Sequence, residues 1–222
     1  MIQGATLKFL RDLEKNNNKA WFDANRNRYT DAKEDFEQFV SSLLARHGKK
    51  DPDIAELTPK QCTFRINRDV RFSKNKSPYK NNMGASLSRG GKKSGFAGYY
   101  FHLQPGASFI GGGLWSPEPA DVKKIRQEID YCRDEFKGLI AGKKFKSYYG
   151  DLYKDEEISL VKVPQGFEKD NPAAEYLRLK SWIAQKSIPD KALSSKELLG
   201  ICAEGLLALQ PLLGFLNRAL HD

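Results

Sequence analysis

Cysteine is scarce and scattered in this sequence. The chain has only three, Cys62, Cys132 and Cys202, set 70 residues apart. An odd and unclustered set does not make a disulfide framework, so we expect reduced thiols in the core of a cytoplasmic protein.

Long apolar runs are also missing. No stretch of 18 consecutive apolar residues occurs, and the first ten residues lack the basic segment, apolar stretch and cleavage site of a secretory signal. We therefore expect no membrane-spanning segment and no membrane partner.

Sequence motifs for common cofactors are absent too. His47, His102 and His221 share no metal-ligand spacing with the cysteines. The glycine runs at 90–91 and 111–113 fit neither a phosphate loop nor a dinucleotide fingerprint, and no nucleophile elbow occurs. We expect no metal and no cofactor, and the sequence leaves open whether the protein is an enzyme.

Aromatic residues are abundant, and they argue for a folded core. The 222 residues include 13 Phe, 9 Tyr and 3 Trp, enough apolar area to exclude a wholly disordered chain. The chain is long enough for one substantial core or two small ones.

Positive charge is concentrated in one segment. The formal net charge is +9, and residues 65–93 alone contribute nine basic side chains against one acid, Asp69. The rest of the chain is nearly neutral. Such a local excess attracts phosphate, carboxylate or a nucleic-acid backbone, although a solvated hairpin with lysine-protected edges would have the same composition.

The periodicity of apolar residues predicts an α+β fold of a single domain, with an antiparallel meander flanked by N- and C-terminal helices. Residues 1–60 read as helical, 61–116 as mainly β, and 117–222 as mixed helix and strand. Short strands are expected at 158–163 and 176–183. A leucine-rich helical region follows at 195–220, which Pro211 either kinks or divides.

Apolar and polar residues alternate from Phe64 to Phe72, as in a strand with one face on the core. Arg68 is the exception, because it falls on the apolar face. Either a bulge turns it outward, or it points inward to a partner.

The same segment is the candidate site. It mixes arginine, which binds oxyanions through two parallel hydrogen bonds, with lysine, and adds aromatic rings and one acid. Asp69 is the candidate general base, although it could instead pair with Arg65 or Arg71 as a structural ion pair. The predicted ligand-binding residues are Arg65, Arg68, Arg71, Lys76, Tyr79, Lys80, Tyr100 and Trp115.

Four ordered motifs also carry a resemblance. They are the segments 17–29, 64–80, 98–103 and 111–117, and together they are similar to the domain of unknown function 2461 family across nearly the whole chain. Family members often have tyrosine at the position of Asn67 and aspartate at that of Asn75, so no carboxylate role transfers to position 75. The resemblance implies a single α+β domain and no particular reaction.

Three functions remain open on this evidence. The preferred hypothesis is a small anionic ligand, phosphorylated or not, in a site lined by arginine and lysine. The alternative is a nucleic acid, with segment 65–93 on the phosphates and Tyr79, Tyr99 or Tyr100 stacked on bases. A third is an acidic protein partner. The oligomeric state is left open.

Overall fold

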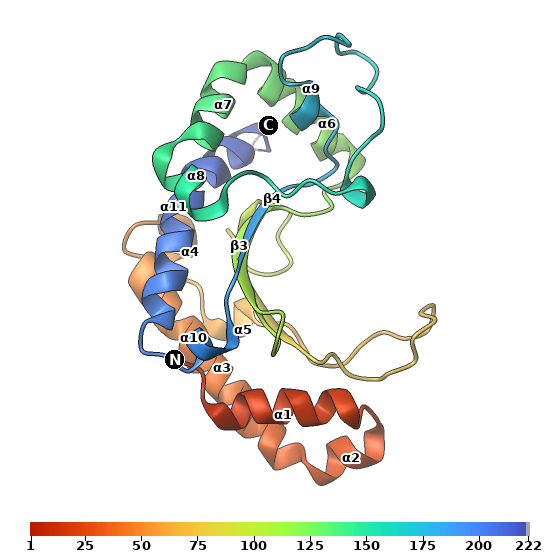
Figure 1. Cartoon of the computed structure of the whole chain (residues 1–222), viewed down its shortest axis with the longest axis vertical. Coiled ribbons are helices and arrows are strands. Elements are labelled where there is room, and N and C mark those ends of the chain that lie inside the picture. The colour runs from red at the N-terminus through yellow and green to blue at the C-terminus, as the bar shows by residue number, and fades with distance from the viewer. Residues whose placement is uncertain (221–222) are drawn as a thin grey trace. The chain divides into compact units, whose positions relative to one another are not determined.

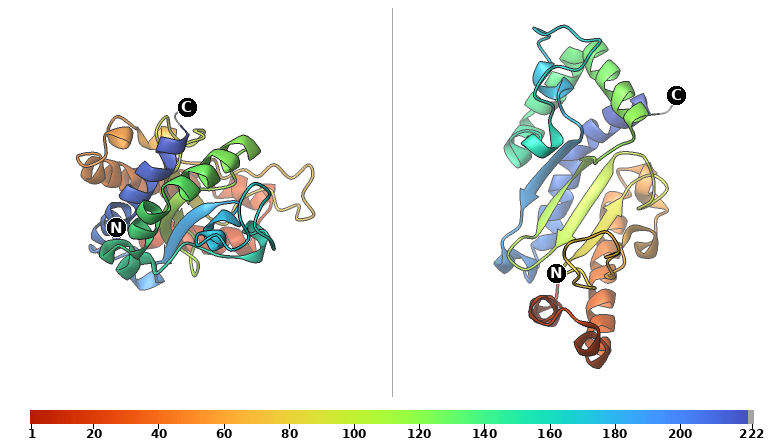
Figure 2. Two further views of the ribbon diagram at one scale, coloured as in Figure 1. Left: turned by 90° about the horizontal axis from the view of Figure 1, so that it is seen from above. Right: turned by 90° about the vertical axis from the view of Figure 1, so that its right-hand side faces the viewer.

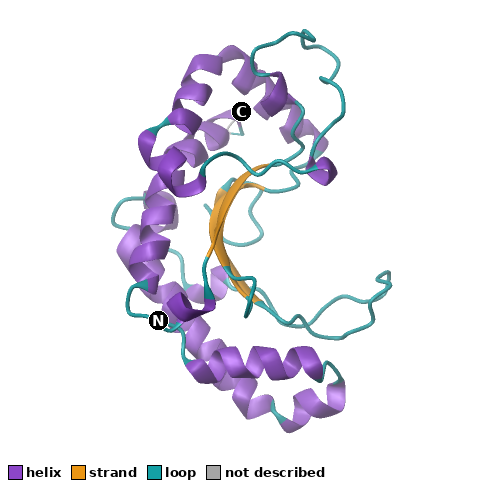
Figure 3. Ribbon diagram, viewed as in Figure 1, coloured by secondary structure: helices purple, strands orange, loops and turns teal. Residues whose placement is uncertain are grey.

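The computed structural model describes residues 1–220 and confirms the α+β fold class (Figures 1 and 3). An antiparallel meander with strand order β1-β2-β3-β4 lies, in chain order, between N-terminal and C-terminal helices. The strands are β1 (Met83–Leu87), β2 (Gly98–Leu103), β3 (Phe109–Leu114) and β4 (Trp182–Ser187).

The helices precede and follow the first three strands. Before them come α1 (Gly4–Lys15), α2 (Lys19–Ala24), α3 (Arg26–His47), α4 (Pro52–Ala55) and α5 (Pro59–Cys62). After β3 come α6 (Pro119–Tyr131), α7 (Arg133–Ala141), α8 (Lys143–Tyr149), a short 3₁₀ helix (Glu156–Ile158) and α9 (Ala174–Leu177). Beyond β4 lie α10 (Asp190–Leu193) and α11 (Leu198–Ala219).

Within this fold, two compact units can be distinguished. Unit 1 comprises Met1–Lys93, Tyr100–Ile110 and Ser187–Glu204. Unit 2 comprises Ser94–Tyr99, Gly111–Lys186 and the described residues from Gly205 onward. The views in Figure 2 follow the same colour order along the chain.

Unit 1 is built on the N-terminal helices. Leu7, Leu10 and Leu13 form the inner face of α1, and all three are buried. The helical stretch that follows is divided at Asn25 into α2 and α3. The side-chain amide of Asn25 donates to the Trp21 carbonyl oxygen at 2.9 Å. This hydrogen bond satisfies a backbone acceptor at the end of α2.

Strand β2 packs against helix α3 through its buried side chains. Tyr99, Phe101 and Leu103 are buried, whereas Tyr100 and His102 on the other face are only half-buried. Phe101 packs against Phe36 and Phe39 of α3, with ring centroids 5.9 and 4.9 Å apart. Helix α3 therefore covers one face, and the polar residues of β2 lie on the other.

Unit 2 has its own aromatic core. Phe136 of α7 contacts Tyr176 and Phe215, with centroid distances of 5.1 and 5.2 Å. Arg218 near the end of α11 forms ion pairs with Glu128 and Glu135, at 2.7 and 2.8 Å. These pairs fix the end of α11 to α6 and α7.

Three sequence predictions in the C-terminal part change. The expected strand at 158–163 is wrong: this segment forms the end of the 3₁₀ helix and a single bridge between Ser159 and Leu179. The strand expected at 176–183 begins instead at Trp182, because α9 occupies the residues up to Leu177. Pro211 lies inside α11 without ending it.

Helix α11 is long and apolar enough to cross a membrane, by length and composition only. Half of its most apolar window is buried inside the protein. One such helix is weak evidence for a membrane span, since core helices pass the same test.

The glycine run of β3 has a packing explanation. A Cβ on Gly111 would lie 2.3 Å from the Ala184 carbonyl oxygen, and one on Gly113 would lie 2.0 Å from the Trp182 carbonyl oxygen. Gly113 also has a φ of 127°, which side-chain-bearing residues rarely adopt. The run therefore allows the backbones of β3 and β4 to approach each other closely.

We predict that Gly113→Ala destabilises the protein by about 3 kcal/mol or more, because it adds backbone strain to a backbone clash. The matched control is Gly138→Ala in α7, where nothing lies within 4 Å of the added Cβ. That change should stabilise by about 0.5–1 kcal/mol through helix propensity. Urea unfolding measures both, and equal effects would contradict the packing explanation.

Candidate functional site

The segment between α5 and β1 forms an irregular hairpin, shown as a long loop in Figure 3. The continuous strand expected from Phe64 to Phe72 is therefore wrong. Only single antiparallel bridges join the two arms, from Thr63 to Ala85 and from Asn67 to Tyr79.

A difference in arm length explains why no ladder forms. Between the two bridges, one arm contains residues 64–66 and the other contains residues 80–84. Regular antiparallel pairing needs equal numbers, so the return arm bulges by two residues between Lys80 and Gly84. A bulge of this kind redirects side chains, and alternation in the sequence cannot report it.

Tyr79 anchors the hairpin to the helices of unit 1. Its ring is only 7% exposed and stacks on Phe22 of α2, with centroids 3.9 Å apart and an interplanar angle of 14°. The side-chain amide of Asn17 accepts from the Tyr79 backbone N–H at 3.1 Å and donates to the Tyr79 carbonyl oxygen at 2.9 Å. Tyr79 thus holds the hairpin in place and presents no ring for base stacking.

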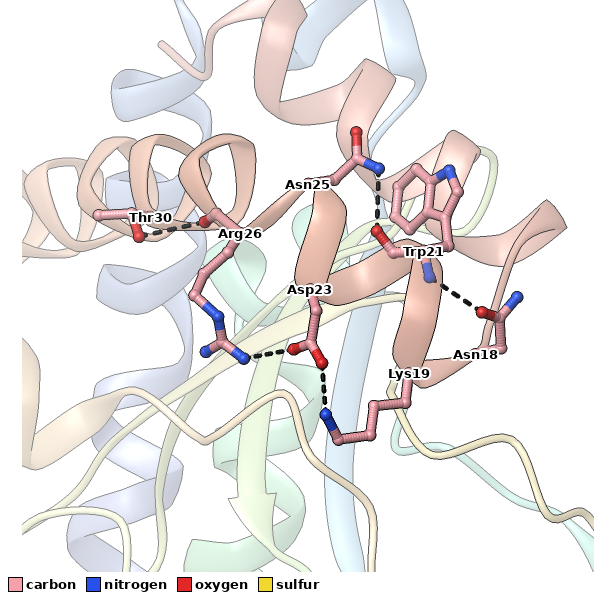
Figure 4. A network of polar contacts seen from close by, with 7 residues as sticks. All are labelled: Asn18, Lys19, Trp21, Asp23, Asn25, Arg26 and Thr30. Atoms are coloured by element: carbon pink, nitrogen blue, oxygen red, sulfur yellow. Dashed lines mark hydrogen bonds and ion pairs between the residues drawn. The ribbon is translucent and has the colours of Figure 1, made fainter.

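Helix α2 carries a polar network beside this anchor (Figure 4). Asn18 caps the helix by accepting from the Trp21 backbone N–H at 2.9 Å. Asp23 forms ion pairs with both Lys19 and Arg26, which lower the pKa of its carboxyl group. These two cations are therefore matched by a carboxylate within the helical region.

Asp69 and Arg71 neutralise each other. Two guanidinium nitrogens of Arg71 donate to the Asp69 carboxylate at 3.0 and 2.7 Å, and the Arg71 backbone N–H adds a third bond at 3.2 Å. These bonds lower the pKa of Asp69. A carboxylate with a lowered pKa is a poor proton acceptor at neutral pH, so the geometry favours the structural ion pair over a general base.

Arg68 and Lys76 hold the hairpin together by binding acceptors across the loop. Arg68 donates to the Ser77 carbonyl oxygen at 3.0 Å and to the Ser73 hydroxyl at 3.3 Å. The Lys76 ammonium donates to the carbonyl oxygens of Val70 at 3.1 Å and Arg71 at 3.4 Å. Of the two alternatives that the sequence left open for Arg68, the structure supports the second, an inward-pointing arginine with partners.

Two other cations of the basic segment also have internal partners. Arg89 pairs with Asp53 at 3.1 Å. The Lys92 ammonium donates to the carbonyl oxygens of Lys60 and Thr63 at 2.7 and 2.6 Å. Much of the local positive charge is thus used in building unit 1.

Lys80 is different. Its side chain is half-buried, and within residues 1–220 no carboxylate lies within ion-pair distance of its ammonium group. The Lys80 Nζ atom lies 5.5 Å from the centroid of the Phe64 ring. The pKa of Lys80 is lowered mainly by burial and, to a smaller extent, by the positive charge of Arg65.

Strand β2 supplies the polar groups beside Lys80. The Tyr100 hydroxyl lies 3.5 Å from His102 Nδ1, and His102 Nε2 lies 3.0 Å from the Gln104 side-chain oxygen. Because an amide oxygen only accepts, Nε2 carries the proton and Nδ1 accepts from Tyr100. Burial lowers the pKa of His102, and the charge of Lys80 adds to that effect, so this imidazole is neutral at pH 7.

Gly84 makes room for the Tyr100 hydroxyl. A Cβ at position 84 would lie 2.3 Å from that oxygen. The Tyr100 ring also lies near Phe64 and Phe109, with centroid distances of 6.4 and 5.8 Å. Phe109 in turn stacks on His102, at 4.8 Å and 10°.

We call this surface the Lys80 face; it comprises Phe64, Arg65, Lys80, Tyr100, His102 and Phe109. It combines two cations that have no carboxylate partner within residues 1–220 with an aromatic floor, all within unit 1. This arrangement can hold an anionic group and pack a flat or apolar body against the rings.

The predicted site residues thus divide. Arg65, Lys80 and Tyr100 belong to the Lys80 face, whereas Arg68, Arg71, Lys76 and Asp69 form the hairpin and Tyr79 anchors it. Trp115 belongs to unit 2, where it is 64% exposed.

Of the residues of the Lys80 face, sequence reasoning did not select Phe64, His102 or Phe109. The alternation of β2 places His102 on the same face as Tyr100, so that pattern could have found it. Asn17 was missed because its contact spans 62 residues of chain, and no local pattern reports such a contact.

The described residues do not form the clusters that metal binding or thiol chemistry would need. Among residues 1–220 no group of three or more histidine, cysteine or acidic side chains is arranged to hold a metal, and His221 lies outside the described residues. All three cysteines are free, as expected. Burial raises the pKa of Cys62 to about 11 and that of Cys202 to about 12, so both are protonated packing residues.

Fold and site together define an α+β protein with an arginine- and lysine-rich hairpin between its helical N-terminal part and its meander. The chain belongs to the family described as Conserved hypothetical protein (DUF2461), whose family model matches residues 5–215. This match confirms the resemblance drawn from the four sequence motifs. No curated protein and no solved structure matches the chain.

We predict that Lys80→Met leaves the free energy of unfolding at pH 7 unchanged or raises it. The folded state lowers the pKa of Lys80, so folding opposes protonation of this amine. The resulting penalty is fully present below the lowered pKa and disappears as the pH rises to the unfolded value of about 10.4. Removing the amine removes the penalty.

Urea unfolding of Lys80→Met at pH 7, with the exposed Lys93→Met as control, measures this effect. The control should stay within about 0.5 kcal/mol of the wild type. A clear loss of stability in Lys80→Met alone would show that the amine has a structural partner.

We predict that Asn17→Ala destabilises the protein by about 1–3 kcal/mol, because it leaves the Tyr79 peptide without partners on both sides. Hydrogen exchange at the Tyr79 amide should accelerate in the same variant. Asn16→Ala, which removes one exposed bond to the Asp12 carbonyl oxygen, is the control and should change neither quantity appreciably. Unchanged exchange in Asn17→Ala would contradict the anchoring role.

Proposed function

We propose that the protein binds a small anionic ligand, of the phosphate or carboxylate class, on the Lys80 face. Lys80 itself supports this most directly: it is a half-buried ammonium beside a second cation, with no carboxylate partner in residues 1–220. Buried charges are normally paired, and an unpaired one is costly. An anion bound at this position would remove that cost.

The neighbouring groups favour an oxyanion with a flat or apolar body. Arg65 offers a planar fork of donors, and Lys80 offers a point charge. The stacked rings of His102 and Phe109 provide apolar surface beside them. A phosphate ester of an aromatic or sugar group has this combination of features.

Binding is better supported than catalysis. The candidate base, Asp69, is held by Arg71, and the imidazole of His102 has both nitrogens engaged. Lys80 is the one group of this face whose lowered pKa brings its neutral form closer to physiological pH. If the protein catalyses a reaction, this amine is the group that we expect to transfer the proton. A cytoplasmic location, where phosphorylated metabolites are abundant, is part of the proposal.

We predict that Lys80→Met weakens binding of 4-nitrophenyl phosphate by about 10- to 100-fold, the range expected for losing one charge-assisted hydrogen bond. Isothermal titration calorimetry measures the affinity. Inorganic phosphate should bind more weakly than 4-nitrophenyl phosphate, because it lacks a ring to pack on the aromatic floor.

The matched control is Lys93→Met, which removes one exposed lysine of the same basic segment and should bind as the wild type does. Arg71→Ala should also retain most of the affinity, since its guanidinium already holds Asp69. If Lys80→Met and Lys93→Met bound equally well, the Lys80 face would not be the site.

A further inference from the structure

The tip of the hairpin, residues 69–77, is a second surface with properties of its own. Phe72 is 95% exposed, more than any other large apolar side chain of the described residues. A ring exposed this fully leaves apolar surface in contact with water, which a bound partner would cover.

Cations surround the exposed ring. Lys74 and Lys76 follow Phe72 within four residues, and the Arg71 guanidinium lies 5.9 Å from the Phe72 ring centroid. No acidic residue occurs in the sequence from Val70 to Pro117. Within the tip, Asp69 is the one acid, and it pairs with Arg71. The positive charge that remains beside Phe72 is that of Lys74 and Lys76.

The tip is built by side chains of its own, and this fixes where the ring is presented. Lys76 and Arg68 bind carbonyl oxygens across the loop, and the Asn75 side chain accepts from the Ser77 backbone N–H at 2.9 Å. A preorganised loop loses less conformational entropy when a partner binds.

We propose that this tip binds single-stranded nucleic acid, with a base stacked on Phe72 and a neighbouring phosphate on Lys74. Single-strand binding surfaces combine aromatic rings with backbone-tracking cations, and each stacked base contributes about 1–3 kcal/mol. The tip reproduces that combination within nine residues. It is separate from the Lys80 face and does not depend on the function proposed for that face.

Other partners fit the tip less well. Insertion into a membrane interface needs a broad apolar face, whereas the tip offers only Val70 and Phe72 among charged and polar residues. An acidic protein would match the cations but would leave the ring without a flat partner. A duplex keeps its bases stacked on one another and so unavailable to Phe72.

The test is fluorescence anisotropy with a labelled 20-nucleotide oligothymidylate. We expect Phe72→Ala to weaken binding about 5- to 100-fold, as loss of one stacked base implies. Phe72→Trp should keep the affinity and show tryptophan quenching beyond that of the wild type when the oligonucleotide is added. Lys74→Ala should reduce the steepness of the salt dependence by about 0.7 in the log–log slope.

Tyr131→Ala is the matched control, because Tyr131 is an exposed aromatic residue of unit 2, at 86% exposure. It should bind oligothymidylate as the wild type does. Phe72→Ala should also bind 4-nitrophenyl phosphate normally, so failure at the tip and failure at the Lys80 face give different results.

Three outcomes would overturn the proposal. They are absence of oligothymidylate binding, binding that is indifferent to Phe72→Ala, and Phe72-dependent binding to phosphatidylserine vesicles in place of the oligonucleotide.

Discussion

The contact between Asn17 and the Tyr79 peptide, together with the stack of Tyr79 on Phe22, holds the base of the hairpin against unit 1. Everything proposed for the hairpin depends on this contact. It determines where the bulged return arm runs and therefore how far Lys80 is taken out of water. It also gives the tip a fixed base.

The basic segment divides into cations that build the structure and cations that remain free for a ligand. Arg68, Lys76 and Lys92 bind carbonyl oxygens, and Arg71 and Arg89 pair with carboxylates. A high count of positive residues is thus a poor measure of anion-binding capacity. Lys80 is informative because its environment opposes its charge, and proteins retain such unfavourable arrangements mainly where function requires them.

The fold class and the helical N-terminal part could be predicted from periodicity, because Leu7, Leu10 and Leu13 follow the spacing of a helix face. The alternation from Phe64 to Phe72 wrongly predicted a continuous strand, because a two-residue bulge on the partner arm prevents regular pairing. Pairing depends on both arms, whereas the pattern describes only one.

For the same reason, the sequence could identify only part of the candidate site. The basic composition pointed to the segment that contains Arg65 and Lys80, but it could not distinguish Lys80 from Lys76, since only the folded chain shows which lysine has partners. Asp69 and Tyr79 changed role because their partners, Arg71 and Asn17, became visible only in the folded chain.

The most direct measurement is the pKa of the Lys80 amine with and without a bound anion, followed by NMR of reductively ¹³C-methylated protein. Without ligand, this amine should titrate below the exposed lysines, and saturating 4-nitrophenyl phosphate should raise its pKa towards theirs. A Lys80 resonance that titrates like the exposed lysines, or that ignores the phosphate ester, would contradict the account.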